Sequence, residues 1–466
     1  MRISHVTELL SPAGSLKNMR YAFAYGADAV YAGQPRYSLR VRNNEFDHDN
    51  LKIGISEAHA LGKKFYVVVN IQPHNSKLKN FIRDLEPIIA MQPDALIMSD
   101  PGLIMMVREH FPDVSVHLSV QANAVNWATV KFWKNMGLSR VILSRELSLE
   151  EIEEIQQNVP DMEIEVFVHG ALCMAYSGRC LLSGYMNKRD ANQGACTNAC
   201  RWEYNIHEAV QDVSGDVIPV KTLETTSNCC NNKDADEQHA LQQHQFGEPV
   251  LLQRNQEEMF AAEEDEHGTY FMNSKDLRAV QHVERLTKMG IHSLKIEGRT
   301  KSYFYCARTA QIYRKAIDDA QSGKAFDPAL MSQLEGLANR GYTEGFLRRH
   351  VHSEYQNYQT GSSRFDHQQF VGEVLERHAN YIKIDVKNRF VVGDSLELMT
   401  TSGNVTFILS EILDKKGHPI LEAKGSGHVV SIPIPANVEI EYALLIRNLP
   451  SSTTDISAAS LAFQAV

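Results

Sequence analysis

Four of the seven cysteines lie close together, and their spacing suggests a metal centre. They follow the pattern Cys-x6-Cys-x15-Cys-x3-Cys and are Cys173, Cys180, Cys196 and Cys200. Thiolates grouped in this way suit zinc or an iron–sulfur cluster. Neither half of the pattern has the two-residue gap of a zinc-ribbon knuckle, which favours the cluster and leaves zinc open. Four small packed thiols on one loop-like stretch are a weaker explanation.

The composition of the 466 residues is that of an ordinary globular protein. Hydrophobic residues make up 43%, charged residues 22% and the mean hydropathy is -0.31, which excludes disordered, collagen-like and membrane-embedded chains. The formal charge is -10, so a nucleic-acid partner would have to contact a local basic patch. The opening MRISHVTELLSPAG lacks the apolar core of a secretory signal. We therefore expect a cytoplasmic protein, in which clustered cysteines serve as ligands more often than as disulfides.

Eight short apolar runs alternate with helical patterns over the first 300 residues. They cover residues 8–12, 27–33, 64–70, 95–100, 114–121, 140–145, 163–169 and 293–297. The continuous apolar stretch 65–69 is typical of a strand buried on both faces. Eight strands joined by helices predict an α/β fold, a closed (β/α)8 barrel of the TIM type. Helices are expected after the Ser148/Glu151 capping box, over about 300–322 and near 328–339.

The interval between the seventh and eighth runs is too long for one crossover helix. Residues 170–291 hold the cysteines and then a polar stretch over about 222–268, which predicts an elaborated insertion on the barrel rim. Later strands are expected at 370–377, 381–386, 395–400, 405–412, 429–433 and 442–449, typical of a small antiparallel β-barrel. We expect a barrel domain over 1–350, a linker over 351–367, a β-barrel domain over 368–450 and a tail over 451–466.

Segments spread over most of the chain carry a family resemblance. They are EVFVHGALCMAYSGRCLLS at 165–183, ELLSPAGSLKNMRYAFAYGADAVYAG at 8–33, LSVQANAVN at 118–126 and HSLKIEGRTKS at 292–302. Together they resemble the U32 family, whose members were once described as peptidases or collagenases. Within that family, GACTNACRW at 194–202 and EDEHGTYFMNSKDL at 264–277 are most similar to members that hydroxylate tRNA with the help of prephenate.

The resemblance implies an enzyme that hydroxylates C5 of the wobble uridine, position 34 of tRNA, to 5-hydroxyuridine. It implies prephenate as co-substrate, an iron–sulfur cluster of the 4Fe–4S type, and the anticodon region of tRNA as partner. The implied cluster ligands are Cys173, Cys180 and Cys196, with Cys200 favoured as the fourth and the adjacent pair Cys229 and Cys230 as the alternative. Four thiolates would leave the cluster to transfer electrons or hold the loop, whereas three would leave one iron open as a Lewis acid. Cys306 is predicted to be a packed thiol.

Reactive groups in a parallel barrel lie at the carboxyl ends of its strands. His169 and Glu297 end the seventh and eighth runs, so both are candidate catalytic groups. A histidine near neutral pKa can act as general acid or base, although one packed under the loop is an alternative. The two carboxylates of prephenate call for cationic donors, each of which could instead form a structural ion pair. The candidate donors are Arg145, Arg179, Arg299 and Lys301.

The cysteine-containing stretch has a basic balance that would suit RNA. Over 173–205 four cations stand against two carboxylates, which is compatible with phosphate contact. Tyr185, Trp202 and Tyr204 could stack on a splayed base or pack under the loop. Residues 346–350, FLRRH, form a second small basic group or a solvated helix end.

Two other functions remain open from the residues alone. The old family description suggests a peptidase, but neither an HExxH zinc motif nor a GxSxG elbow occurs. A related hydroxylase acting on ribosomal RNA or on a quinone precursor is the other alternative.

Overall fold

The computed structural model describes six long stretches, 6–39, 45–172, 275–339, 341–348, 368–434 and 438–449. It also describes the segments 176–180, 205–211, 217–219, 248–254, 258–265 and 268–269, and the single residues Ser183, Arg189, Asn192 and Gly194. No helix in these stretches combines the length and apolar character that crossing a membrane requires.

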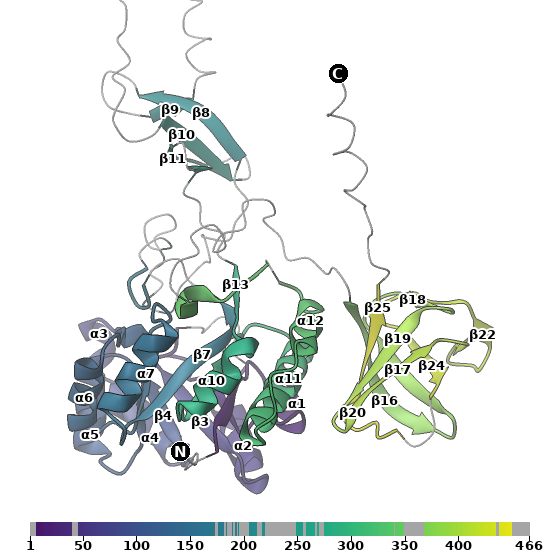
Figure 1. Cartoon of the computed structure of the whole chain (residues 1–466), viewed down its shortest axis with the longest axis horizontal. Helices are drawn as coiled ribbons and strands as arrows, with labels where there is room; N and C mark the ends of the chain where they lie inside the picture. The colour runs from purple at the N-terminus through teal and green to yellow at the C-terminus, as the bar shows by residue number, and fades with distance from the viewer. Residues whose placement is uncertain are drawn as a thin grey trace, which may run out of the picture.

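Eight parallel strands close into a barrel (Figure 1). They are β1 (Glu8–Pro12), β2 (Ala29–Gly33), β3 (Lys64–Val69), β4 (Ala95–Met98), β5 (Val116–Leu118), β6 (Arg140–Ile142), β7 (Glu163–Ala171) and β14 (Ser293–Ile296). From β1 to β7 each strand pairs with the next, and β14 closes the ring between β7 and β1. The TIM-like barrel and all eight of its expected strands are therefore confirmed.

Helices cover the barrel, and side-chain caps fix where many of them begin. They are α1 (Leu16–Ala24), α2 (His48–Ala60), α3 (Asn75–Leu78), α4 (Phe81–Ile89), α5 (Pro101–His110), α6 (Trp127–Asn135), α7 (Leu149–Asn158), α10 (Val283–Lys288), α11 (Tyr303–Gln321) and α12 (Ala329–Glu335). There are also three short 3-10 helices in the described residues, η2 (Val120–Ala122), η5 (Val280–His282) and η6 (Gly345–Arg348). At α7 the expected capping box is present, since Glu151 N donates to Ser148 Oγ and Ser148 N donates to the Glu151 carboxylate.

Part of the barrel interior is charged, which the apolar look of the strands does not reveal. The buried Arg140 guanidinium lies 2.6 Å from Glu8, 2.8 Å from Glu163 and 3.1 Å from Glu165. The ammonium of Lys295 lies 2.7 Å from the other oxygen of Glu165, whose side chain is fully buried. Removing one member of such a network leaves a buried charge unpaired, which costs about 3–5 kcal/mol.

The insertion after β7 contains strands that its polar composition hides. An antiparallel sheet is formed by β8 (Asn205–Gln211), β9 (Val217–Pro219), β10 (Glu248–Arg254), β11 (Glu258–Asp265) and β12 (Gly268–Thr269). Two of these strands carry short apolar runs, VLL and MFAA, inside the stretch expected to be a polar loop. The chain returns to the barrel through β13 (Asp276–Arg278), which pairs with the end of β7, and β15 (Tyr342–Thr343) pairs with β13.

The carboxy-terminal part is an antiparallel sheet domain, as expected. Its strands are β16 (Gln368–His378), β17 (Tyr381–Val386), β18 (Phe390–Val391), β19 (Ser395–Thr400), β20 (Gly403–Ile408), β21 (Ile412–Leu413), β22 (Pro419–Ile420), β23 (Glu422–Ala423), β24 (Val429–Pro433) and β25 (Leu444–Asn448). Eight pair in the order β20-β19-β25-β16-β17-β24-β21-β22, and β18 pairs with β23. The single strand expected over 405–412 is two strands, β20 and β21. Between them, the backbone of Leu409 accepts a hydrogen bond from Gly393 N and donates one to Asp394 O.

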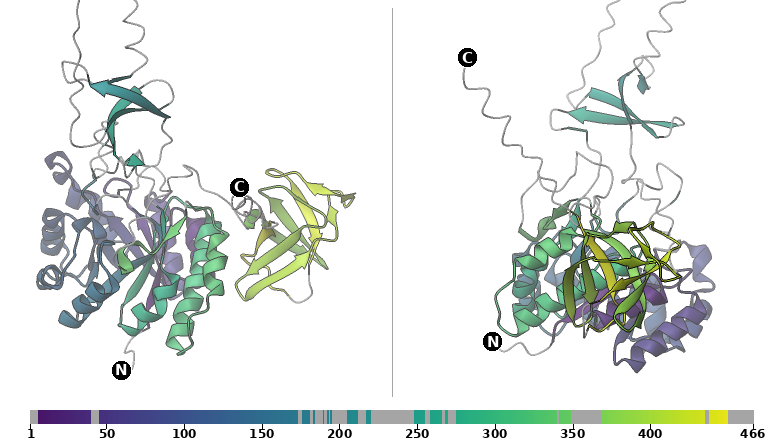
Figure 2. Two further views of the ribbon diagram at one scale, coloured as in Figure 1. Left: turned by 45° about the horizontal axis from the view of Figure 1, so that its top comes forward. Right: turned by 90° about the vertical axis from the view of Figure 1, so that its right-hand side faces the viewer.

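Partly buried polar contacts dock the sheet domain on α1 and α11, beside which it lies in Figures 1 and 2. The Glu373 carboxylate accepts from Lys17 at 2.5 Å, from Tyr21 at 2.8 Å and from Tyr303 at 3.2 Å. Arg308 on α11, 1% exposed, lies 2.7 Å from Glu397 of β19. Because α1 and α11 lie on the outside of the barrel, these contacts hold the domain against that side.

Candidate active site at the barrel mouth

A tyrosine, a carboxylate and an arginine meet at the carboxyl ends of the barrel strands. The Tyr31 hydroxyl donates to Ile296 O at 2.9 Å and lies 3.1 Å from Glu297 Oε2. Arg145 Nη2 lies 3.8 Å from the same carboxylate, and its Nη1 donates to Ala171 O at 2.8 Å. Burial raises the pKa of Tyr31 well above its usual value, and Glu297 acts in the same direction. Tyr31 therefore stays a hydrogen-bond donor at neutral pH.

The guanidinium of Arg145 is held flat at this position. Its central carbon lies 3.9 Å from the centre of the Phe167 ring, a cation–π contact that fixes the plane of the group. The buried Nε has no hydrogen-bond partner among the described residues. An arginine oriented in this way can offer a further N–H to a carboxylate, so Arg145 fits the predicted role of substrate donor.

Lys295 and Arg299 add two more cations around Tyr31. The Lys295 ammonium lies 4.2 Å and the Arg299 guanidinium 5.7 Å from the centre of the tyrosine ring. Burial lowers the pKa of Lys295, and Glu165 counteracts this by stabilising the charged form. Arg299 was expected from the sequence, but Lys295 was missed. The sequence signal that could have identified Lys295 is that it is the single charged residue in the buried strand SLKI.

A close approach of backbone fixes the position of Glu297. Gly170 has φ +106°, and a Cβ at this position would lie 2.3 Å from the carbonyl oxygen of Glu297. Glu297 N also donates to His169 O at 2.8 Å. Only glycine accommodates this conformation and this contact, so the HG dipeptide of the sequence motif has a packing reason.

His169 does not lie among these groups. Its side chain is 1% exposed and contacts the rings of Tyr305, Tyr313 and Tyr342, with centres 5.8, 5.5 and 5.5 Å away. Burial lowers the pKa of His169 to about 3, and the nearby charges of Lys301 and Arg278 act in the same direction. The imidazole is therefore neutral near pH 7 and a weak base. Its geometry favours the packed alternative, and its catalytic role stays a prediction.

The other two predicted donors are Lys301 and Arg179. Lys301 has its ammonium 5.5 Å from the centre of the Tyr305 ring. Arg179 is exposed in the cysteine-containing segment, where its backbone N–H donates to Tyr176 O. The substrate role of both residues stays a prediction.

The cysteine-containing segment touches the mouth at three places. Ser177 N donates to the Glu146 carboxylate at 3.3 Å, next to Arg145. A Cβ at Gly178 would lie 2.2 Å from the carbonyl oxygen of Gln121, just after β5. Gln72 N, just after β3, donates to Asn192 O at 3.1 Å. The segment therefore lies over the carboxyl ends of β3, β5 and β6.

Of the predicted cluster ligands, the structure describes only Cys180. It is half-buried and lies two residues after the Gly178 contact, so its thiol belongs to the segment over the mouth. Cys173, Cys196, Cys200, Cys229 and Cys230 lie outside the described residues, and the described part of the chain contains no group of three metal-binding side chains. The ligand set therefore stays a prediction. Cys306 is fully buried, and burial raises its pKa to about 12, consistent with a packed thiol.

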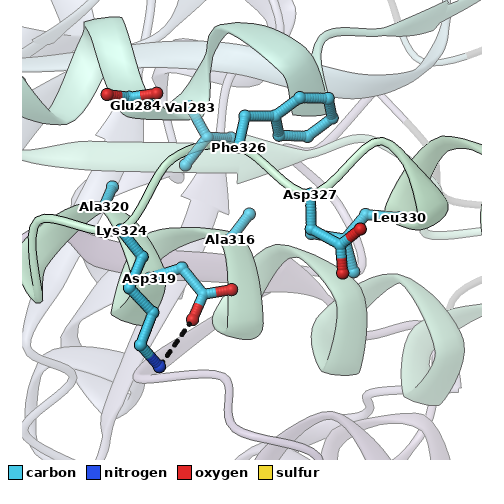
Figure 3. A pocket seen from close by; sticks show the side chains of 9 residues that line it. All are labelled: Val283, Glu284, Ala316, Asp319, Ala320, Lys324, Phe326, Asp327 and Leu330. Atoms are coloured by element: carbon cyan, nitrogen blue, oxygen red, sulfur yellow. Dashed lines mark hydrogen bonds and ion pairs between the residues drawn. The ribbon is translucent and has the colours of Figure 1, made fainter.

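A small pocket on the outer surface is not a second substrate site. It lies between α10, α11 and α12, and Lys324 Nζ lies 3.4 Å from Asp319 Oδ1 beside it (Figure 3). About 10 Å³ of it could hold a water molecule, which is too little for an organic substrate.

Comparisons with known proteins extend over nearly the whole chain. The tRNA hydroxylation protein P of Escherichia coli (strain K12) is 66% identical over 456 residues, covering 96% of this chain and 98% of that protein. The 23S rRNA 5-hydroxycytidine C2501 synthase of the same organism is 28% identical over 85% of this chain and 53% of that protein. The match to a solved structure of a U32 peptidase covers 36% of this chain and 70% of the peptidase chain, with 12% sequence identity and a TM-score of 0.32.

Two family descriptions match the two folded parts of the chain. Residues 14–357 match Peptidase family U32, and residues 366–447 match its C-terminal domain. The resemblance that the HGALC and EGRTKS segments suggested is thereby confirmed. The chain belongs to Peptidase family U32.

Proposed function

We propose that this protein hydroxylates tRNA, at C5 of the wobble uridine, with prephenate as co-substrate and an iron–sulfur cluster held by the cysteine-containing segment. Identity of 66% over almost the full length of a protein named for tRNA hydroxylation supports the reaction class. The observation in the structure that carries the proposal is the set of three cations around Tyr31, at the same mouth of the barrel where the cysteine-containing segment lies over the ends of β3, β5 and β6.

The cations give prephenate a place to bind. Arg145, Lys295 and Arg299 surround Tyr31; Glu297 lies beside Tyr31 and Arg145, and Glu165 pairs with Lys295. The Arg145 and Arg299 guanidinium groups are the two donors that could each bind one carboxylate of the substrate. The Tyr31 hydroxyl, which stays protonated and hydrogen-bonds to Ile296 O and Glu297, holds the Glu297 carboxylate beside these cations.

The cysteine-containing segment fits a cluster above this site. Cys180 lies in a stretch fixed at Ser177 and Gly178, which would hold its thiolate steady. A bound iron–sulfur cluster would supply electron transfer, or an open iron if only three thiolates bind it. Cys173, Cys196 and Cys200 would complete the ligand set, with Cys229 or Cys230 in place of Cys200 as the alternative.

Nucleoside analysis tests the proposal. Mass spectrometry of tRNA from a strain lacking this protein should show no 5-hydroxyuridine or derivatives at position 34, and the wild-type protein should restore them. Protein purified without oxygen should show the broad visible absorbance of an iron–sulfur cluster. Colourless protein containing stoichiometric zinc would contradict the cofactor assignment.

Hydroxylation of ribosomal RNA is the second candidate. The 28% identity to a protein named for 5-hydroxycytidine in 23S rRNA favours it, but that match covers only 53% of the rRNA enzyme. Hydroxylated cytidine in ribosomal RNA should be measured in the same strains. Its loss, with tRNA unchanged, would favour this candidate.

A further inference from the structure

Exposed or partly exposed cations gather on one side of the barrel mouth, on the two segments that follow β2 and β3. Arg36 follows β2, Lys77 lies in α3, Lys79 follows α3 and Arg83 lies in α4; we call these four residues the β2–β3 rim. The Arg36 and Arg83 side chains are 60% and 72% exposed. The rim is at the mouth because both segments start at strand carboxyl ends, and α3 lies at the same end of the barrel as β13 (Figure 1).

One carboxylate organises the rim. Arg36 Nη1 lies 2.5 Å, the Tyr37 hydroxyl 3.0 Å and Arg83 Nη2 3.5 Å from oxygens of Asp84. The Tyr37 hydroxyl also approaches Lys77 O at 3.4 Å, which keeps α3 beside this group. Partial burial lowers the pKa of Lys77, and the charge of Arg36 acts in the same direction, as expected where cations crowd together.

The rim continues into the cysteine-containing segment. The Gln72–Asn192 hydrogen bond joins the two just before α3. Arg189, three residues before Asn192, and Arg179 are both exposed. Tyr176, whose carbonyl accepts from Arg179 N, is 60% exposed, although large aromatic side chains are usually covered.

The local charge is opposite to that of the chain as a whole. Over residues 34–39, 71–86 and 176–192, which hold the rim, Arg179 and Arg189, seven basic residues stand against the three carboxylates Asp84, Glu86 and Asp190. The whole chain has 47 basic and 57 acidic residues. Cations held close together repel one another unless an anion binds between them, so this excess points to a polyanionic partner.

We propose that the β2–β3 rim, with Arg179 and Arg189, binds the phosphates of tRNA on either side of the base that enters the mouth. The proposal rests on the proposed function, which supplies tRNA as the substrate. Arginine and lysine contacts to phosphate provide affinity without reading the base. The exposed Tyr176 is placed to stack on a neighbouring unpaired base.

Charge reversal on the rim tests this surface. The variant Lys79→Glu/Arg83→Glu changes two exposed side chains that lie away from the Tyr31 group. The control Lys131→Glu/Lys134→Glu makes the same change in charge on α6, where Lys134 has only the exposed partner Asp161. Both full-length holoproteins are titrated with tRNA from a strain lacking the protein, over a series of salt concentrations.

The rim variant should bind this tRNA about tenfold to a hundredfold more weakly than wild type, with a salt slope reduced by about 1 to 2. The control should bind within about twofold of wild type, and prephenate affinity should be unchanged in both proteins. If the rim variant and the control bind tRNA with equal affinity, the proposed binding surface is wrong, but the proposed function is not affected. Failure of wild-type protein to bind tRNA would overturn both this surface and the proposed function.

Discussion

Gly170 and Glu297 are in contact across the seam between β7 and β14, with no room for a side chain on the glycine. A Cβ at Gly170 would lie 2.3 Å from Glu297 O, and the glycine has φ +106°. The two residues come from sequence motifs about 130 positions apart, one leading into the cysteines and the other carrying the carboxylate. The contact therefore fixes the backbone position of Glu297 relative to the start of the cysteine-containing segment.

Replacing Gly170 with alanine should disturb both the fold and the site. The strained φ and the steric overlap together should lower the free energy of unfolding by about 3 kcal/mol. Gly62→Ala is the matched control, since Gly62 also has positive φ, +65°, but no described atom lies within 4 Å of its added Cβ. The control should lose only about 1 kcal/mol. Urea unfolding of both variants measures this, and equal losses would argue against a tight contact.

Arg145→Lys should weaken prephenate binding while leaving the charge in place. Lysine lacks the planar group that stacks on Phe167 and donates to Ala171 O, so we expect affinity to fall about tenfold or more. Titration calorimetry with prephenate measures the effect. Arg285→Lys, on the outside of α10, is the control and should bind as wild type does. Unchanged affinity in Arg145→Lys would remove this arginine from the substrate site.

His169→Phe should retain hydroxylation. Phenylalanine preserves the packing against the three tyrosine rings and loses only the Nδ1 contact at 3.3 Å from Tyr313. Because the pKa of His169 is about 3, its protonation does not change between pH 6 and 8, and the pH–rate profile should keep its shape. A general acid or base would instead cost about 10²–10⁴-fold in rate. A loss of that size together with a changed pH profile would restore the catalytic role.

Glu8 should contribute stability that is lost in acid. Burial raises its pKa, but Arg140, Lys64 and Tyr66 outweigh burial and bring the pKa to about 2, below the ordinary 4.5. A depressed carboxylate pKa contributes stability above pH 4.5, and that contribution, about 3 kcal/mol, disappears as pH falls towards 2. The free energy of unfolding of Glu8→Gln should therefore depend less on pH over this range. Glu86→Gln, an exposed control, should follow wild type; if Glu8→Gln does so too, the network carries no such linkage.

The barrel could be predicted from sequence because its signals are local. Apolar runs mark the strands, and Ser148 with Glu151 marks the start of α7. The charged interior could not be predicted, because Arg140 and Lys295 form ion pairs with residues on other strands, which come together only when the barrel closes. Strands β10 and β11 were missed because their apolar runs are short beside acidic residues.

The candidate site was predicted in part. Arg145, Glu297 and Arg299 lie near Tyr31 as strand-end residues, but Tyr31 itself and Lys295 read as ordinary strand positions. His169 was a candidate because it ends the seventh apolar run, at the carboxyl end of a barrel strand. Its ring packs against Tyr313 of α11 and Tyr342 of β15 instead of joining the Tyr31 group, and only the tertiary structure shows this packing.

The most direct test measures the nucleoside at position 34 of tRNA in a strain lacking this protein and complemented with variants. Wild type and Cys306→Ala, which changes the packed thiol, should restore 5-hydroxyuridine, whereas Cys180→Ala should leave uridine unmodified and the purified protein poor in iron. Separate Cys200→Ala and Cys229→Ala variants identify the fourth ligand. Full restoration of 5-hydroxyuridine by Cys180→Ala, or its presence in the uncomplemented strain, would contradict a cluster-dependent tRNA hydroxylase.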